Sequence, residues 1–174
     1  EGKAPTPAAT HLFQVRDDPV PVDKEKAETF HKMVMQLQYL SQRARPDLRT
    51  AVSFLCKRVK APDEDDYKKL TRVLRYLQRT VNLKLRLKSD GSGVIQWWVD
   101  ASYAVHPDMK GHTGGTMSMG EGSIYSMASG QKLVARSSTE SELIGVHDVM
   151  PQMIWTAYFL NAQGHVVDTL MHQD

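Results

Sequence analysis

Three carboxylates stand at positions where side chains from separate elements can meet. Asp100 lies near the end of a predicted strand over residues 94–103, Glu142 lies in the first turn of a predicted helix, and Asp174 ends a predicted last strand. Acidic side chains that converge at one edge of a sheet are ligands for hard divalent cations. A pair of Mg²⁺ ions about 4 Å apart can activate a water and stabilise the leaving oxygen in phosphodiester cleavage. The pattern therefore indicates a metal-dependent hydrolytic site.

Each of these acids also has an ordinary structural interpretation. Asp100 can simply terminate a strand, and Asp174 can be a frayed terminal residue. Residues 139–142 read Thr-Glu-Ser-Glu, a capping-box pattern in which Glu142 only satisfies the helix N-terminus. The joint pattern favours the metal site, but for each single acid both interpretations stay open.

Hydrophobic periodicity after residue 80 predicts the strands and the helix that position these acids. Leu83, Leu85 and Leu87 alternate with basic residues and predict a half-buried strand, and residues 90–93 form a glycine-rich turn or joint. In residues 94–103 every second side chain is apolar, so one face is expected to be buried. The remaining predictions are strands over 113–119, 123–128 and 166–174, and a helix that begins at Thr139, is kinked or divided at Pro151 and ends at Gly164.

Upstream of residue 80 the period is helical. Residues 1–23 contain four prolines and predict an extended lead-in. Three apolar stripes follow, with Asp23 as N-cap of the first helix, Pro46 at the start of the second and the acids of residues 63–66 at the start of the third. The connections are short, so residues 24–80 are expected to form a three-helix bundle. We therefore predict an α+β chain, in which residues 81–174 form a mixed α/β sheet domain with a helix that is cut off at its last strand.

Composition excludes several classes of protein. The chain has 174 residues, no apolar run near the roughly 18 residues of a membrane span, and no secretory signal pattern at its start. A single cysteine, Cys56, excludes a disulfide framework and a cysteine-rich zinc site, which favours a reducing, intracellular setting.

Charge is divided unevenly along the chain. Residues 24–80 carry 14 basic and 7 acidic side chains, net +7, whereas residues 81–174 carry 6 and 9, net −3. A basic bundle is suited to a polyanion, and the predicted phosphate contacts are Arg72, Arg75, Arg79, Lys68 and Lys69, joined by Arg43, Arg45 and Arg49. The alternative is a solvated basic face. The loop histidines His106 and His112, which flank the loop beside Asp100, are expected to be exposed, and the alternative is a role as metal ligands or in proton transfer.

Several short motifs resemble one known family. They are the strings at residues 97–103 (WWVDASY), 112–115 (HTGG), 131–133 (QKL) and 137–143 (SSTESEL), and upstream those at 37–40 (LQYL), 45–48 (RPDL) and 72–77 (RVLRYL). In this order they resemble the thumb or connection segment and the RNase H region in the Pol polyprotein of copia-type LTR retrotransposons. The likeness covers residues 30–174.

The resemblance implies an RNase H-like fold that cuts the RNA strand of an RNA–DNA hybrid with two Mg²⁺ ions, or Mn²⁺ in their place. Asp100 matches the family's first acid, Glu142 the second in preference to Glu140, and Asp174 the third. The fourth acid lies downstream, so the domain is expected to be incomplete and its activity weak or absent.

The resemblance also implies binding roles, partners and a location. Ser138 and Thr139 match small polar residues that touch the RNA 2′-hydroxyl. The basic bundle matches the polymerase thumb that grips the hybrid. The remainder of the reverse transcriptase polyprotein is a further expected partner, no membrane is involved, and the location is intracellular, in cytoplasmic virus-like particles.

Two other functions remain open from the sequence. One is a fragment or domesticated protein that binds nucleic acid through the bundle and does not cut it. The other is an integrase-like metal-dependent nuclease that acts on DNA. An RNase H fails on double-stranded DNA, so substrate preference separates the two enzymes, and any cleavage separates both from the binding module.

Overall fold

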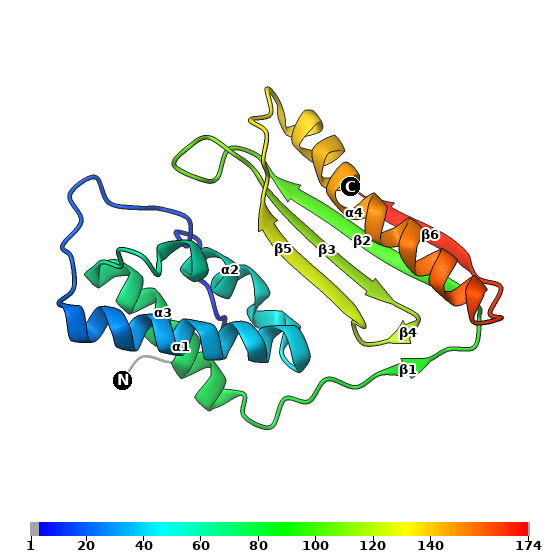
Figure 1. Cartoon of the computed structure of the whole chain (residues 1–174), viewed down its shortest axis with the longest axis horizontal. Helices are drawn as coiled ribbons and strands as arrows, with labels where there is room; N and C mark the ends of the chain where they lie inside the picture. The colour runs from blue at the N-terminus through cyan, green and yellow to red at the C-terminus, as the bar shows by residue number, and fades with distance from the viewer. Residues whose placement is uncertain (1–3, 174) are drawn as a thin grey trace. The chain divides into compact units, whose positions relative to one another are not determined.

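The chain folds into two compact units, which we describe separately. The computed structural model describes residues 4–173 (Figure 1). The first unit is Glu1–Lys84 and the second is Leu85–Asp174. Within residues 4–173, no helix has both the length and the apolar character needed to cross a lipid bilayer.

Three helices form the first unit, as their sequence periodicity predicts. They are α1 (Lys24–Arg43), α2 (Arg49–Arg58) and α3 (Glu64–Arg79), with the short 3-10 helix η1 (Pro46–Leu48) before α2. The Asp23 side chain accepts a hydrogen bond from the Lys26 amide at 2.8 Å and so caps α1. Asp63 and Asp66 form a reciprocal capping box at the start of α3. Side-chain oxygens therefore satisfy helix-start amides that have no partner within the helix.

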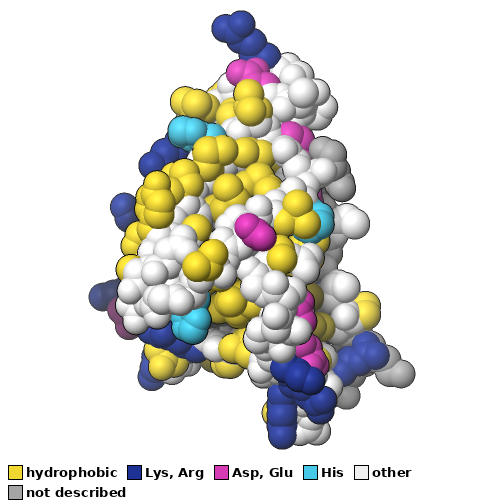
Figure 2. All heavy atoms as spheres, turned by 90° about the vertical axis from the view of Figure 1, so that its right-hand side faces the viewer, with side chains coloured by type: hydrophobic (Ala, Val, Ile, Leu, Met, Phe, Trp, Pro, Cys, Tyr) yellow, Lys and Arg dark blue, Asp and Glu magenta, His cyan; other side chains and the backbone are white. Residues whose placement is uncertain are grey.

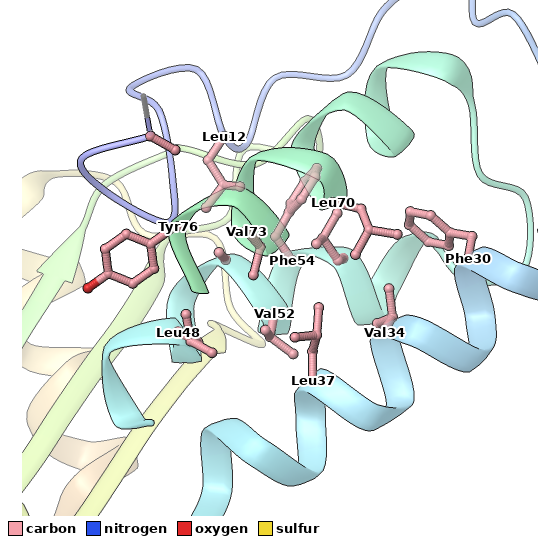
Figure 3. Close-up of a cluster of buried hydrophobic side chains, with 13 residues drawn as sticks. Leu12, Phe30, Val34, Leu37, Leu48, Val52, Phe54, Leu70, Val73 and Tyr76 are labelled. Carbon is pink, nitrogen blue, oxygen red and sulfur yellow. The ribbon is translucent and has the colours of Figure 1, made fainter. Parts of the chain in front are cut away.

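The core of the first unit lies between the three helices. Phe30, Val34 and Leu37 from α1 meet Val52 from α2 and Leu70 from α3, and all of them are buried (Figure 3). The lead-in before α1 contributes to the same cluster through the buried side chains of Ala4 and Leu12. The predicted extended segment thus covers the bundle and is part of its packing.

The second unit is built on a four-stranded mixed sheet with the strand order β5-β3-β2-β6. Its strands are β2 (Val94–Ser102), β3 (His112–Ser118), β5 (Tyr125–Gly130) and β6 (Asp168–Gln173). Strands β2, β3 and β5 pair antiparallel, and β6 runs parallel to β2. Helix α4 (Ser138–Ala162) makes the crossover between β5 and β6, so its N-terminus comes shortly after the sheet edge at β5. The chain is therefore an α+β protein.

One face of β2 packs against α4. Ile95, Trp97 and Val99 are buried together with Met117 of β3 and Val149 of α4, which confirms the predicted alternation. Gly145 lets the helix approach closely, because a Cβ at this position would lie 3.2 Å from the Cβ of Ala101. Pro151 lies inside one continuous helix and does not start a second segment, so that alternative is wrong.

The outer surface of α4 remains apolar. Figure 2 looks onto the side of the molecule that carries α4 and β6, and hydrophobic side chains gather across it. Exposed members of this surface include Leu143, Ile154, Trp155, Tyr158 and Phe159. Contiguous exposed apolar surface of this kind is typical of regions that contact another chain or segment.

The strand predicted from Leu83, Leu85 and Leu87 is wrong. Leu83 and Leu87 are 52% and 56% exposed, and the only strand nearby is the two-residue β1 (Lys88–Ser89). Strand β1 pairs antiparallel with β4 (Gly120–Glu121) and has no place in the four-stranded sheet. Alternation of apolar and basic residues produces a strand only where a partner edge is available, and here that edge is two residues long.

Candidate functional site

Glu142 reaches the backbone beside Asp100 where β2 ends beside the first turns of α4. Asp100 is exposed near the end of β2, and Glu142 is half-buried on α4. The Glu142 carboxylate oxygen Oε1 accepts a hydrogen bond from the Ala101 amide at 3.2 Å. This amide belongs to the peptide bond that links Asp100 to Ala101. The acid from the helix is thus placed directly at the strand residue that carries the other acid.

The capping interpretation of Glu142 is wrong, because other residues cap α4. Ser137 is the N-cap, and its hydroxyl accepts a hydrogen bond from the Glu140 amide at 3.2 Å. The Glu140 carboxylate in turn accepts from the Arg136 amide at 2.6 Å. The helix begins two residues earlier than the Thr139-based pattern implies. Glu142 is therefore free of the cap and reaches the strand.

Removing the charge of Glu142 and removing that of Glu140 should affect different properties of the protein. We expect Glu142→Gln to weaken Mn²⁺ binding strongly, since a neutral amide is a poor ligand for a hard cation. Glu140→Gln should leave Mn²⁺ binding unchanged and lower the stability of the second unit by about 0.5 kcal/mol, through loss of a negative charge near a helix N-terminus. Mn²⁺ titration and thermal unfolding of both variants test this. If Mn²⁺ affinity instead depended on Glu140 and not on Glu142, Glu140 would be the metal ligand.

The third predicted acid, Asp174, lies outside the described residues. The last registered pair of the parallel strands is Val99 with Gln173, the residue before it. Gln173 Nε2 lies 3.5 Å from Glu142 Oε2, so the end of β6 also reaches the Glu142 carboxylate. Within residues 4–173, no three histidine, cysteine or acidic side chains come together as a metal site. The described part of the site is the pair Asp100 and Glu142.

The loop between β2 and β3 contradicts one expectation. His106 and His112 are buried, with only 7% and 5% of their surface exposed, and they are not exposed loop histidines. His106 Nε2 lies 3.0 Å from His112 Nδ1, a hydrogen bond that closes the loop over residues 106–112. Their spacing in the sequence does not indicate this contact, because it depends on how the loop folds back.

The predicted 2′-hydroxyl contacts lie on the exposed side of the same helix start. Ser138 and Thr139 are both exposed in the first turn of α4. On β2, the exposed Trp98 has the same strand parity as Asp100 and stacks on His172 of β6, with ring centroids 5.2 Å apart. The sequence analysis missed Trp98 and Gln173 as neighbours of the site. The parallel register of β2 and β6, which would have indicated them, is not visible in the sequence.

The predicted phosphate contacts of the first unit divide into two groups. Lys69 is buried, and its ammonium group contacts the Gln14 carbonyl oxygen at 2.6 Å and the Asp65 carboxylate at 3.0 Å. Arg72 donates to the Thr6 carbonyl oxygen at 3.1 Å and to the Thr6 hydroxyl at 3.0 Å. Both side chains therefore hydrogen-bond residues of the lead-in, which reduces their availability for phosphate. Lys68, Arg75 and Arg79 are exposed on α3 and retain the predicted availability.

The remaining basic residues of the predicted set differ in the same way. Arg45 is only 6% exposed and pairs with Asp47 at 2.8 Å, so it is not a surface cation. Arg43 is exposed, and its guanidinium lies 5.9 Å from the centroid of the Tyr39 ring. Arg49 is half-buried. Helical spacing alone does not separate these cases.

The chain is an α+β protein, and in its second unit the crossover helix places the Glu142 carboxylate at the peptide bond after Asp100. The Pol polyprotein from transposon RE1 of Arabidopsis thaliana is 33% identical over 136 residues, which are 78% of this chain and 9% of that protein. The Pol polyprotein from transposon TNT 1-94 of Nicotiana tabacum is 28% identical over 165 residues, 91% of this chain and 12% of that protein. The chain belongs to the copia-type retrotransposon Pol family.

A shorter relative is matched over most of its length. The protein named Secreted RxLR effector protein 161, from Plasmopara viticola, is 32% identical over 120 residues, 68% of this chain and 84% of that protein. The word secreted in that name describes the Plasmopara viticola protein. The chain spans only about a tenth of the two polyproteins described above. No protein-family model matches the chain, and no solved structure does.

Proposed function

We propose that the second unit is an RNase H-like domain that hydrolyses the RNA strand of an RNA–DNA hybrid. Membership in a retroelement Pol family supports a role in nucleic-acid processing. The strand order, with three antiparallel strands followed by a helical crossover to a parallel fourth, agrees with the fold that the sequence motifs imply. The observation that carries the proposal is the 3.2 Å hydrogen bond from the Ala101 amide to Glu142, because it brings the helix acid to the backbone directly after Asp100.

The residues at this position fit a hard divalent cation. Carboxylate oxygens are the ligands that Mg²⁺ and Mn²⁺ prefer, and Mg²⁺ in particular needs few protein ligands because it keeps several waters. When bound, the cation supplies Lewis-acid activation of the scissile phosphate and of the attacking water. Asp100 and Glu142 hold it in this proposal, with Asp174 as the third ligand. Gln173 orients the Glu142 carboxylate.

The substrate is selected by groups around the acids. Ser138 and Thr139, exposed at the start of α4, are placed to contact the RNA 2′-hydroxyl, which distinguishes RNA from DNA.

A substrate panel tests the proposal. The chain is incubated with Mn²⁺ and an end-labelled RNA–DNA hybrid, double-stranded DNA or double-stranded RNA. We expect slow cleavage of the RNA strand of the hybrid and of nothing else. Cleavage of double-stranded DNA would indicate an integrase-like nuclease. Tight binding of the hybrid without any cleavage, even when the acids bind Mn²⁺, would indicate a non-catalytic binding module.

We further propose that exposed cations on α3 grip the hybrid backbone. Changing Arg75 and Arg79 together to Glu should weaken hybrid binding by about tenfold or more and make the dependence of log K on log salt shallower by about 2, one for each lost phosphate contact. Arg72 is left unchanged, because its contacts with Thr6 would confuse loss of binding with loss of packing. Fluorescence anisotropy at several salt concentrations measures both quantities.

The matched control changes the same amount of charge elsewhere in the first unit. Lys24 and Lys32 are exposed on α1, and the double change to Glu removes an equal net charge. This control should lower affinity much less than the α3 variant. Equal effects of the two double variants would show that net charge acts at long range and that Arg75 and Arg79 are only a solvated face.

A further inference from the structure

A buried glutamine connects the start of α4 to the sheet. Gln131 lies between β5 and α4 and is only 3% exposed. Its side-chain Nε2 donates to the Ser141 carbonyl oxygen at 2.8 Å and to the Thr113 hydroxyl at 3.2 Å. Its Oε1 accepts from the Ser141 hydroxyl at 3.1 Å. One side-chain amide thus holds the hydroxyl and the carbonyl group of the residue that directly precedes Glu142.

The same network fixes α4 at a second point. Thr113, which is fully buried on β3, donates its hydroxyl to Asp148 Oδ2 at 3.1 Å. Asp148 lies two helical turns after Ser141 on the same helix. Two hydrogen-bonded points on one helix fix its rotation and its position along the sheet. Buried polar networks with all members paired rigidify the elements that they join.

The backbone around Gln131 is also tightly closed. The backbone N–H of Gln131 donates to the Gly111 carbonyl oxygen at 2.9 Å. A Cβ at Gly111 would lie 2.7 Å from both the Ser102 carbonyl oxygen and the Ser141 hydroxyl. Glycine at this position therefore lets the end of the β2–β3 loop, the Gln131 segment and the first turn of α4 approach one another. This junction lies beside residues 100–102 of β2.

We propose that Gln131 is a positioning residue for the acid pair: it fixes the first turn of α4 so that Glu142 meets the peptide bond after Asp100. The inference rests on the proposed function, in which Glu142 holds the cation. Only an amide side chain provides the two donors and the acceptor that Ser141 and Thr113 require. A residue without them removes two hydrogen bonds from Ser141 and one from Thr113 in a buried place, and so loosens the helix start.

The Ala101 amide proton provides a readout that is independent of activity. It donates to the Glu142 carboxylate, so its NMR chemical shift in the 174-residue chain reports whether Glu142 is in place. Glu142→Ala defines the shift of the unbonded state. We expect Gln131→Leu to move the Ala101 signal most of the way toward that state. We also expect it to lower Mn²⁺ affinity about tenfold or more, as is usual when a residue that orients a metal ligand is lost.

The control is another buried polar residue of the same helix. Thr156 is 6% exposed, and its hydroxyl donates to the Gln152 carbonyl oxygen one turn earlier in the same helix, at 2.8 Å. Thr156→Val should lower stability without changing the Ala101 signal or Mn²⁺ affinity. If Gln131→Leu behaves like Thr156→Val, Gln131 only supports the fold and the proposal is overturned.

Two further measurements keep the outcome decisive. If Gln131→Leu does not fold, Ser141→Ala takes its place. This change removes the hydroxyl that donates to the Gln131 side chain and introduces a strong helix former. It should shift the Ala101 signal in the same direction by a smaller amount. An unchanged signal in Ser141→Ala would then overturn the proposal. If the wild-type chain shows no Glu142-dependent Mn²⁺ binding, the proposed function fails, whereas the Ala101 signal still decides whether Gln131 positions Glu142.

Discussion

We expect Asp100→Asn to abolish cleavage of the RNA strand of a hybrid while hybrid binding stays close to that of the wild type. Asparagine keeps the size of the side chain and removes the charge that holds the cation. The cation is worth several kcal/mol of transition-state stabilisation, and a loss of about 4 kcal/mol corresponds to about a thousandfold in rate. Binding is kept because the carboxylate acts on the transition state more than on the grip of the substrate.

The measurement needs a form with a readily detected rate. The chain is extended at its C-terminus with the segment that follows the matched region in the RE1 polyprotein, and RNA cleavage is followed with Mg²⁺ or Mn²⁺. Glu140→Gln, which removes an acid only two residues from Glu142, serves as the control and should retain most of the rate. A cleavage rate in Asp100→Asn similar to that of Glu140→Gln would contradict the assignment of Asp100 as a metal ligand.

Arg45→Ala should lower the stability of the first unit. The Arg45 guanidinium donates to both Asp47 carboxylate oxygens, at 3.0 and 2.8 Å, and to the Thr80 carbonyl oxygen at 3.0 Å. It also lies over the Tyr76 ring, 5.5 Å from its centroid. Arg45 therefore joins the start of η1 to the end of α3. Arg45 is buried but Asp47 is exposed, so the loss corresponds to a few hydrogen bonds of a charged group, about 1.5–3 kcal/mol.

Urea unfolding of the whole chain, followed by a probe of the first unit, measures this loss. Arg43→Ala is the matched control, because Arg43 is exposed two residues earlier and its contact with Tyr39 is worth well under about 1 kcal/mol. Equal stabilities of the Arg45 and Arg43 variants would contradict the structural role of Arg45.

The Arg45 variant should also change the acid sensitivity of the first unit. Burial raises the pKa of Asp47, but hydrogen bonds from Arg45 and Tyr76 outweigh it, and the pKa is lowered overall. A lowered pKa stabilises the fold above the unfolded-state value near 4, and this contribution is lost as the pH falls through the folded-state value. Stability measured between about pH 5 and pH 2 should therefore decline less steeply in Arg45→Ala than in the wild type. An identical decline would show that Asp47 owes its pKa to other groups.

The helices of the first unit could be predicted because local chemistry decides where they begin. Asp23 is a capping residue by type and position and caps α1 in the structure, and the acids of residues 63–66 marked the start of α3, where Asp63 is the N-cap. Alternation along residues 94–103 likewise predicted the buried face of β2, because a half-buried strand has period two. These signals lie within a few residues of the elements that they specify.

What could not be predicted depends on contacts between distant segments. Helical spacing places Arg72, Arg75 and Arg79 on one face, but the lead-in residue Thr6, 66 positions before Arg72, decides which of them is occupied. The spacing of residues 139–142 fits a helix cap as well as a metal ligand, and the N-cap at Ser137 separates the two only once the helix start is known. Gln131 belongs to a short motif of the family, but the motif did not indicate its contacts with Ser141 and Thr113, because these depend on how β5 and α4 pack.

Mn²⁺ titration of the 174-residue chain, followed by electron paramagnetic resonance, tests most directly whether Asp100 and Glu142 form a cation site. The wild type should remove free Mn²⁺ with a single saturable site, and both Asp100→Asn and Glu142→Gln should weaken that site strongly, while Glu140→Gln keeps it. Binding that is absent from the wild type, or that is the same in all four proteins, would contradict the account.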